Sequence, residues 1–103
     1  MNRHEFAVVG GGLAGLATAW HLARMGAEVV VLESQTPGHD GGSSHGRARM
    51  TRSTYGSRLY VELVAEAHAR DWPELSEAAG EPLIRWADAV FFGPRGGLFT
   101  TFE

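Results

Sequence analysis

The sequence predicts an α/β fold built around one strand–helix–strand unit, and three observations in its first 33 residues indicate this. Glycines occur at positions 10, 12 and 15, which is the G-x-G-x-x-G spacing of a dinucleotide-binding turn. A short apolar run precedes these glycines, and a stretch with helical character follows them. A β-branched run then ends in an acidic residue. This order is typical of a Rossmann-like βαβ nucleotide-binding unit.

The elements of this unit are predicted in chain order. The first strand covers Phe6–Val9, the helix runs from Leu13 to about Met25, and the second strand covers Glu28–Leu32. Gly26 follows the helix at the position where a left-handed C-terminal cap is common.

Each glycine of the motif has a separate predicted role in binding the cofactor. Gly10 permits a tight turn out of the strand, Gly12 leaves space for a pyrophosphate, and Gly15 lets the helix lie close to the sheet. The first turn of the helix, with Leu13 and Ala14, presents unpaired N–H groups and the positive end of the helix dipole. We therefore expect the phosphates at this helix end.

Glu33 ends the second strand, with Ser34 beside it, and both are candidate cofactor-binding residues. A carboxylate at this position can accept hydrogen bonds from both ribose hydroxyls, and it would repel a ribose 2′-phosphate. NADP is therefore disfavoured. The unit alone fits FAD and NAD equally well, so an NAD-dependent dehydrogenase is one alternative function.

Composition excludes several other classes of protein. The chain has 103 residues, a net charge of −3 and no cysteine, so we expect no nucleic-acid or membrane partner, no disulfide and no thiolate metal site. The five histidines show no metal-site spacing, and no metal is expected. The successive glycines argue against an N-terminal signal peptide or a membrane span, and a cytoplasmic location is expected.

The segment from Ser34 to Gly46 is rich in glycine and serine and has no hydrophobic period. It is either a flexible linker or a functional loop at the ligand crevice, where loops of open α/β sheets carry function. Three arginines follow between Arg47 and Arg52. They form either a solvated basic turn or a short helical piece. If the piece is helical, Arg49 and Arg52 lie on one face at i, i+3, which suits two neighbouring anionic groups, while Arg47 points away.

The rest of the chain is predicted to add a helix and a second layer. Residues 57–80 have helical period, Pro73 should kink or restart that helix, and Gly80 should end it. Residues 81–103 contain short aromatic and β-branched runs, with a turn at 93–97, which predict the start of an antiparallel layer on the substrate side. Residues 1–56 form the nucleotide-binding unit and its loop. Only two parallel strands are visible, so we expect the chain to be part of a larger two-domain protein.

With these motifs in place, the sequence resembles the FAD-dependent amine oxidases typified by monomeric sarcosine oxidase and N-methyltryptophan oxidase. The likeness covers nearly the whole chain, and its most specific part is the Ser-His-Gly-x-x-Arg-x-x-Arg pattern that ends at Arg52. The segments that carry the likeness are Val8–Gly15, Val31–Glu33, Gly42–Arg52, Tyr55-Gly56, Tyr60-Val61 and Val90–Pro94. The arginine segment discriminates against the NAD-dependent alternative.

The resemblance implies FAD as cofactor and assigns roles to the segment after Glu33. Ser43 and Ser44 would hold the flavin end, His45 and Arg49 would lie against the isoalloxazine as catalytic residues, and Arg52 would bind the substrate carboxylate. A cation there suits the negative charge that develops on a reduced flavin.

The implied reaction converts a secondary amine or amino acid to an imine, and O2 reoxidises the flavin. The rest of the polypeptide or an oligomer partner would complete the sheet. A truncated, non-catalytic FAD-binding fragment is the second alternative.

Overall fold

The structure is a computed structural model that describes residues 3–97. The chain divides into two compact units, Met1–Arg49 and Met50–Glu103, and each unit is described by itself. The helices and strands are β1 (Phe6–Val9), α1 (Leu13–Arg24), β2 (Val29–Leu32), α2 (Arg58–Glu66), the π-helix η1 (Ala67–Asp71) and α3 (Trp72–Ala79).

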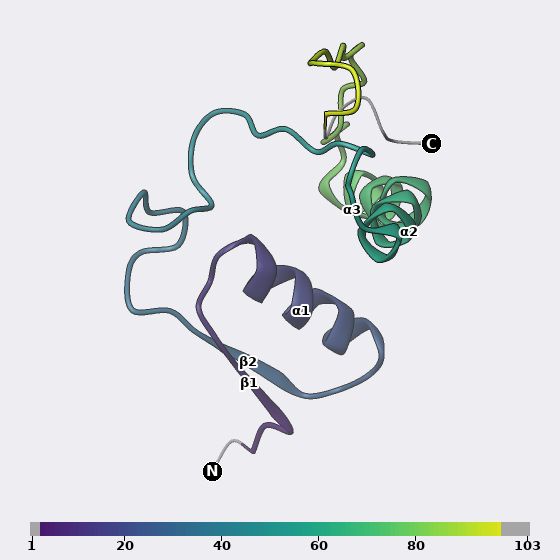
Figure 1. Ribbon diagram of the computed structural model, residues 1–103. Helices are drawn as coiled ribbons and strands as arrows, with labels where there is room; N and C mark the ends of the chain where they lie inside the picture. The colour runs from purple at the N-terminus through teal and green to yellow at the C-terminus, as the bar shows by residue number, and fades with distance from the viewer. Residues whose placement is uncertain (1–2, 98–103) are drawn as a thin grey trace. The chain divides into compact units, whose positions relative to one another are not determined.

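The first unit has the predicted βαβ architecture. Strands β1 and β2 pair in parallel, with Phe6 opposite Val29 and Val9 opposite Leu32. Helix α1 connects the strands and contacts both of them, as Figure 1 shows for the purple and blue part of the chain. The parallel register places the ends of both strands at one edge, which is where this class of fold binds ligands.

The predicted glycine cap ends α1. Gly26 has φ +90°, its N–H donates to the Ala23 carbonyl at 3.0 Å, and the Ala27 N–H donates to the Leu22 carbonyl at 3.1 Å. These two bonds form a Schellman motif, in which a left-handed residue lets the chain leave the helix while the last carbonyls keep partners. The chain can then enter β2 directly.

The core of the first unit is small. Ala19, on α1, is 8% exposed and is the only buried residue in the described part of the chain. On the strands, Val9 is 83% exposed and Leu32 is 53% exposed, although both are residue types that folded domains usually bury. Within the described residues of the first unit, the two-stranded sheet therefore presents uncovered apolar surface.

The second unit contains the predicted helix in three parts. It begins after Ser57 and ends at Gly80, whose φ of +76° confirms the predicted C-terminal position. Pro73 lies in the first turn of α3, where its missing N–H costs least, and the π-helix η1 directly precedes α3. Because proline cannot donate to the preceding turn, the helix widens by one residue in η1 and continues without a break as α3. None of the described helices is both long and apolar enough to cross a bilayer.

The antiparallel layer predicted for residues 81–103 is not found in the described part of that segment. Residues 81–97 contain no strand, although the predicted turn is present, with the Gly97 N–H donating to the Pro94 carbonyl at 2.9 Å. A strand needs a hydrogen-bonded neighbour, and within residues 3–97 the only sheet is the β1–β2 pair. Val90 and Phe92 are accordingly 85% and 86% exposed. The predicted run Leu98–Phe102 lies outside the described residues.

Candidate functional site

The parallel register brings the glycine turn and the end of β2 together. The Gly10 N–H donates to the Leu32 carbonyl at 2.8 Å, which extends the ladder by one bond beyond Val9. Glu33 is the next residue after Leu32, so its side chain starts at the edge from which the glycine turn leaves β1. This placement follows from the register alone.

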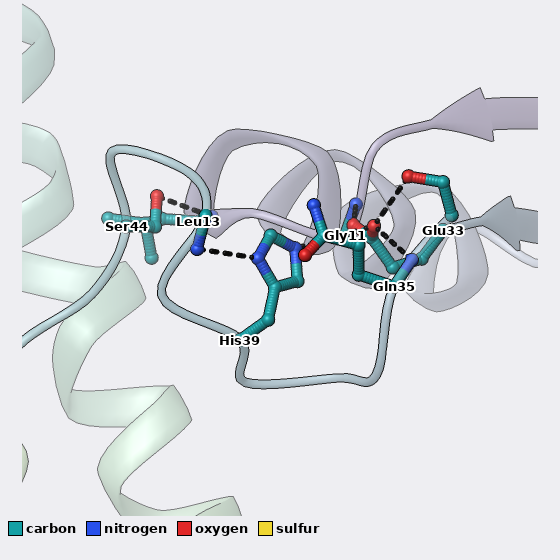
Figure 2. A network of polar contacts seen from close by, with 8 residues as sticks. Gly11, Leu13, Glu33, Gln35, His39 and Ser44 are labelled. Atoms are coloured by element: carbon teal, nitrogen blue, oxygen red, sulfur yellow. Dashed lines mark hydrogen bonds and ion pairs between the residues drawn. The ribbon is translucent and has the colours of Figure 1, made fainter.

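Both oxygens of the Glu33 carboxylate have donors in the structure. Oε2 accepts the Gly11 N–H at 2.7 Å, and Oε1 accepts the Gln35 N–H at 2.9 Å. The Nε2 atom of His39 lies 3.4 Å from Oε1. Figure 2 shows these groups converging on Glu33 from the glycine turn and from the loop after β2. The carboxylate therefore joins the two segments that form the site.

These donors favour the ionised form of Glu33. The Gly11 N–H lowers the pKa of the carboxyl most, the Gln35 N–H lowers it further, and partial desolvation opposes both. The side chain is 17% exposed, so an anion is held at a largely covered position. Each carboxylate oxygen has two lone pairs, and among the described residues Oε2 accepts only the Gly11 N–H, so Glu33 keeps capacity for one ribose hydroxyl while it holds the loop.

His39 is held in one tautomer by its second contact. Its Nδ1 atom accepts the Gly41 N–H at 3.0 Å, so the proton of the neutral ring belongs on Nε2, which faces Glu33. His39 then donates toward the carboxylate and supports its orientation.

The N-terminus of α1 is capped from a distant part of the chain. Gly12 is the N-cap and has no side chain, and the Leu13 N–H donates to the Ser44 hydroxyl at 3.0 Å. Helix geometry gives the N–H groups of Ala14 and Gly15 no carbonyl within the helix. This end of α1 thus offers donors to an anion, and Ser44 brings the loop after β2 to it (Figure 2).

Close backbone approach explains three glycines in this region. A Cβ on Gly15 would lie 2.0 Å from the Gly10 carbonyl oxygen, which confirms the close packing predicted for Gly15. A Cβ on Gly11 would lie 3.0 Å from Glu33 Oε2, and one on Gly12 would lie 3.3 Å from Ser44 Oγ. Side chains at these positions would push away the groups that close the site.

A pocket of about 260 Å³ lies between the glycine turn and the loop after β2. Five predicted cofactor-binding residues line it, namely Gly12, Glu33, Ser34, Ser43 and Ser44. Gly10 lines a second hollow of about 470 Å³ at the ends of both strands, and this hollow shares Glu33 and Ser34 with the first. Ala14 and Gly15 belong to α1 and line neither hollow.

Sequence reasoning missed three contributors to this site: Gly11, Gln35 and His39. The run of three glycines signals close backbone approach at the middle residue, and this signal could have identified Gly11. Gln35 acts through its backbone N–H, which no side-chain pattern reveals. His39 lies in a segment without hydrophobic period, where the sequence does not define the direction of a side chain.

The predicted flavin-side residues are only partly assembled within one unit. Arg49 donates to the Ser43 carbonyl at 2.7 Å, which ties it to the loop that lines the pocket. His45 is exposed and does not line the pocket. Arg52 belongs to the second unit, where its guanidinium carbon lies 5.1 Å from the centre of the Tyr55 ring.

The donor set fits the adenosine diphosphate half of a dinucleotide. Backbone donors at the start of a helix suit a pyrophosphate, glycines without Cβ allow it to approach, and a held carboxylate suits a ribose. Within residues 3–97, no three histidine, cysteine or acidic side chains gather where they could hold a metal ion.

Comparison with known proteins agrees with this geometry. Residues 5–98 match the model of a family described as FAD dependent oxidoreductase. The chain is 33% identical over 97 residues to N-methyl-L-tryptophan oxidase from Yersinia pestis (strain Pestoides F), and equally to the protein of that name from Yersinia pseudotuberculosis (serotype O:1b, strain IP 31758). These matches cover 93% of the chain and 26% of each relative, so the chain spans about a quarter of the length of these curated relatives. No solved structure matches the chain significantly.

Proposed function

Because the chain belongs to the FAD-dependent oxidoreductase family, we propose that it forms the FAD-binding part of an enzyme that oxidises a secondary amine or amino acid to an imine, with O2 as the electron acceptor. The observation that supports this most directly is the Glu33 carboxylate, held beside a glycine turn that leaves room for a pyrophosphate. The similarity to N-methyl-L-tryptophan oxidases supports an amine as substrate class.

The residues of the chain have separate roles in this proposal. The α1 N-terminus and Gly12 would bind the pyrophosphate, and Glu33 would bind the adenosine ribose. Arg49, tied to Ser43, would provide a positive charge at the flavin end, and Arg52 would bind the carboxylate of an amino-acid substrate. FAD, when bound, would supply the two-electron acceptor that these side chains lack.

The visible absorption spectrum of the purified protein tests the cofactor. We expect flavin bands that persist after desalting, and Glu33→Ala should release the flavin more readily. His4→Ala is the matched control, because His4 is an exposed residue outside both hollows. A colourless protein that binds NAD instead would contradict the proposal.

Imine formation is tested separately from cofactor binding. In the complete flavin-loaded enzyme of which this chain would form the FAD-binding part, peroxide release from N-methyl amino acids should depend on Arg52. Arg52→Ala should raise KM for the amino acid far more than it changes the flavin spectrum. Equal KM values for the wild type and Arg52→Ala would show that Arg52 does not bind the substrate.

A further inference from the structure

In the second unit, His68 holds the chain segment that contains Arg52. Its Nε2 atom lies 3.0 Å from the Thr51 hydroxyl, and its Nδ1 atom lies 3.5 Å from the Ser53 hydroxyl. The edge of the ring contacts Trp86, with ring centres 5.2 Å apart and planes at 76°. The shorter bond to Thr51 is the stronger contact. The imidazole is therefore fixed between two hydroxyls and an indole.

The chemistry of a neutral imidazole matches this pair of hydroxyls. One ring nitrogen donates and the other accepts, while a hydroxyl can do either, so both contacts are satisfied in either tautomer. An aliphatic side chain at position 68 would leave the hydroxyls of Thr51 and Ser53 without this partner. His68 lies in η1, and π-turns inside helices often occur at functional sites.

The two contacts restrain the residue between them. Thr51 and Ser53 flank Arg52, and both contact the His68 ring, so the backbone on each side of Arg52 is tied to η1. The Arg52 guanidinium carbon lies 5.1 Å from the centre of the Tyr55 ring, which packs 6.0 Å from the ring of Tyr60 on α2. A guanidinium over a tyrosine face keeps its N–H edge available for a carboxylate.

We propose that His68 is a positioning residue that fixes the direction of Arg52 and thereby orders the group that binds the substrate carboxylate. The inference rests on the proposed function of Arg52. An arginine on an unrestrained segment loses rotamer freedom when it binds a ligand, whereas an arginine that is already ordered loses less. The contacts of His68 therefore increase the affinity of Arg52 for a carboxylate, although His68 does not touch the carboxylate.

Substrate affinity is the first readout of this proposal. In the complete flavin-loaded enzyme, His68→Ala should raise KM for an N-methyl amino acid by about tenfold, while kcat changes by less than about twofold, since only the ordering of a binding group is lost. The dissociation constant of propionate, measured from its effect on the flavin spectrum, should rise in parallel. His68→Gln retains a donor and an acceptor and should restore much of the affinity, and His4→Ala should behave as wild type.

A second readout is independent of the flavin and of turnover. The Nε–H resonance of Arg52 should be shifted by the Tyr55 ring in the wild type, and it should move to the position of an exposed arginine in His68→Ala. If His68→Ala does not fold, Thr51→Val combined with Ser53→Ala removes the same two hydrogen bonds.

The two readouts separate failure of this inference from failure of the proposed function. An unchanged Arg52 resonance together with wild-type propionate binding in His68→Ala would overturn the positioning role. A resonance that shifts as expected in a protein that binds no propionate would retain the positioning role and refute the function proposed for Arg52.

Discussion

Replacing Gly15 by alanine tests the closest backbone contact of the nucleotide site. The added Cβ would lie 2.0 Å from the Gly10 carbonyl oxygen and 3.4 Å from a methyl group of Val8. Neither Gly10 nor the helix backbone can rotate out of the way as a flexible side chain could. To reach an ordinary contact of 3.4 Å, α1 would have to move by about 1.4 Å from the glycine turn.

The cost of this movement appears in binding. Overpacking costs about 1–3 kcal/mol when backbone has to shift. The better helix propensity of alanine stabilises α1 in the free and the FAD-bound protein alike, so it does not change the affinity. The free protein can relax by letting α1 move, but FAD binding requires the first turn of α1 to return to the phosphates. We therefore expect Gly15→Ala to weaken FAD by about 2 kcal/mol, or about 30-fold in the dissociation constant.

Titration of the flavin-free protein with FAD, followed by quenching of flavin fluorescence, measures this change. Gly93→Ala is the matched control, because its Cβ would meet nothing within 4 Å and its φ is not left-handed. It should bind FAD within about twofold of wild type, as surface substitutions usually do. If a folded Gly15→Ala protein bound FAD as tightly as the control, the close approach of α1 to Gly10 would have no part in cofactor binding.

Three further predictions follow from the first unit and from the small core. Folding lowers the pKa of Glu33, so the stability that its carboxylate contributes is complete above the ordinary glutamate pKa and is lost as the pH falls through the lowered value. Circular dichroism from about pH 7 to about pH 2 should therefore show an acid transition that Glu33→Gln reduces. Identical curves for the two proteins would contradict this prediction. Ser44→Ala should reduce the hydrogen-exchange protection of the Leu13 N–H by about fivefold, which is equivalent to the loss of one helix cap of about 1 kcal/mol. Equal protection of this N–H in the variant and the wild type would show that water replaces the hydroxyl without cost. The isolated 103-residue chain with added FAD should produce no peroxide from sarcosine above the free-flavin background. Its apolar strands are exposed to solvent, so the chain cannot enclose an amine and exclude water from it. Peroxide production that Arg52→Ala abolishes would refute this prediction.

Local signals in the sequence predicted most of the first unit. The β-branched run and the glycine spacing predicted the parallel pair and α1, and Gly26 and Gly80 adopt the left-handed conformations expected of helix ends. Such features depend on a few neighbouring residues, so one sequence is enough to identify them.

Features that depend on distant partners could not be predicted in the same way. The bond from Leu13 to Ser44 spans 31 positions and closes only because the loop after β2 folds back on the helix, which no periodicity encodes. The runs in residues 83–92 have the composition of strands, but composition does not supply the neighbour with which a strand must pair. Pro73 signalled an irregular helix, and only the structure shows that the irregularity is a π-turn on the N-terminal side of the proline.

The π-helix η1 also determines how this chain should be aligned with its relatives. A π-turn holds one residue more than the α-helical turn it replaces, so a relative whose helix is continuous here will align with a one-residue gap between Ala67 and Asp71. A gap placed after Leu75 would match Trp72 and Leu75 to positions on the wrong face of the relative's helix. Deleting one residue from η1, for example Ala69, should convert α2 and α3 into a single regular helix and leave the side chains that follow on the same face. A deletion within α2 should instead turn the side chains that follow by about 100° around the helix axis, the rotation per residue of an α-helix.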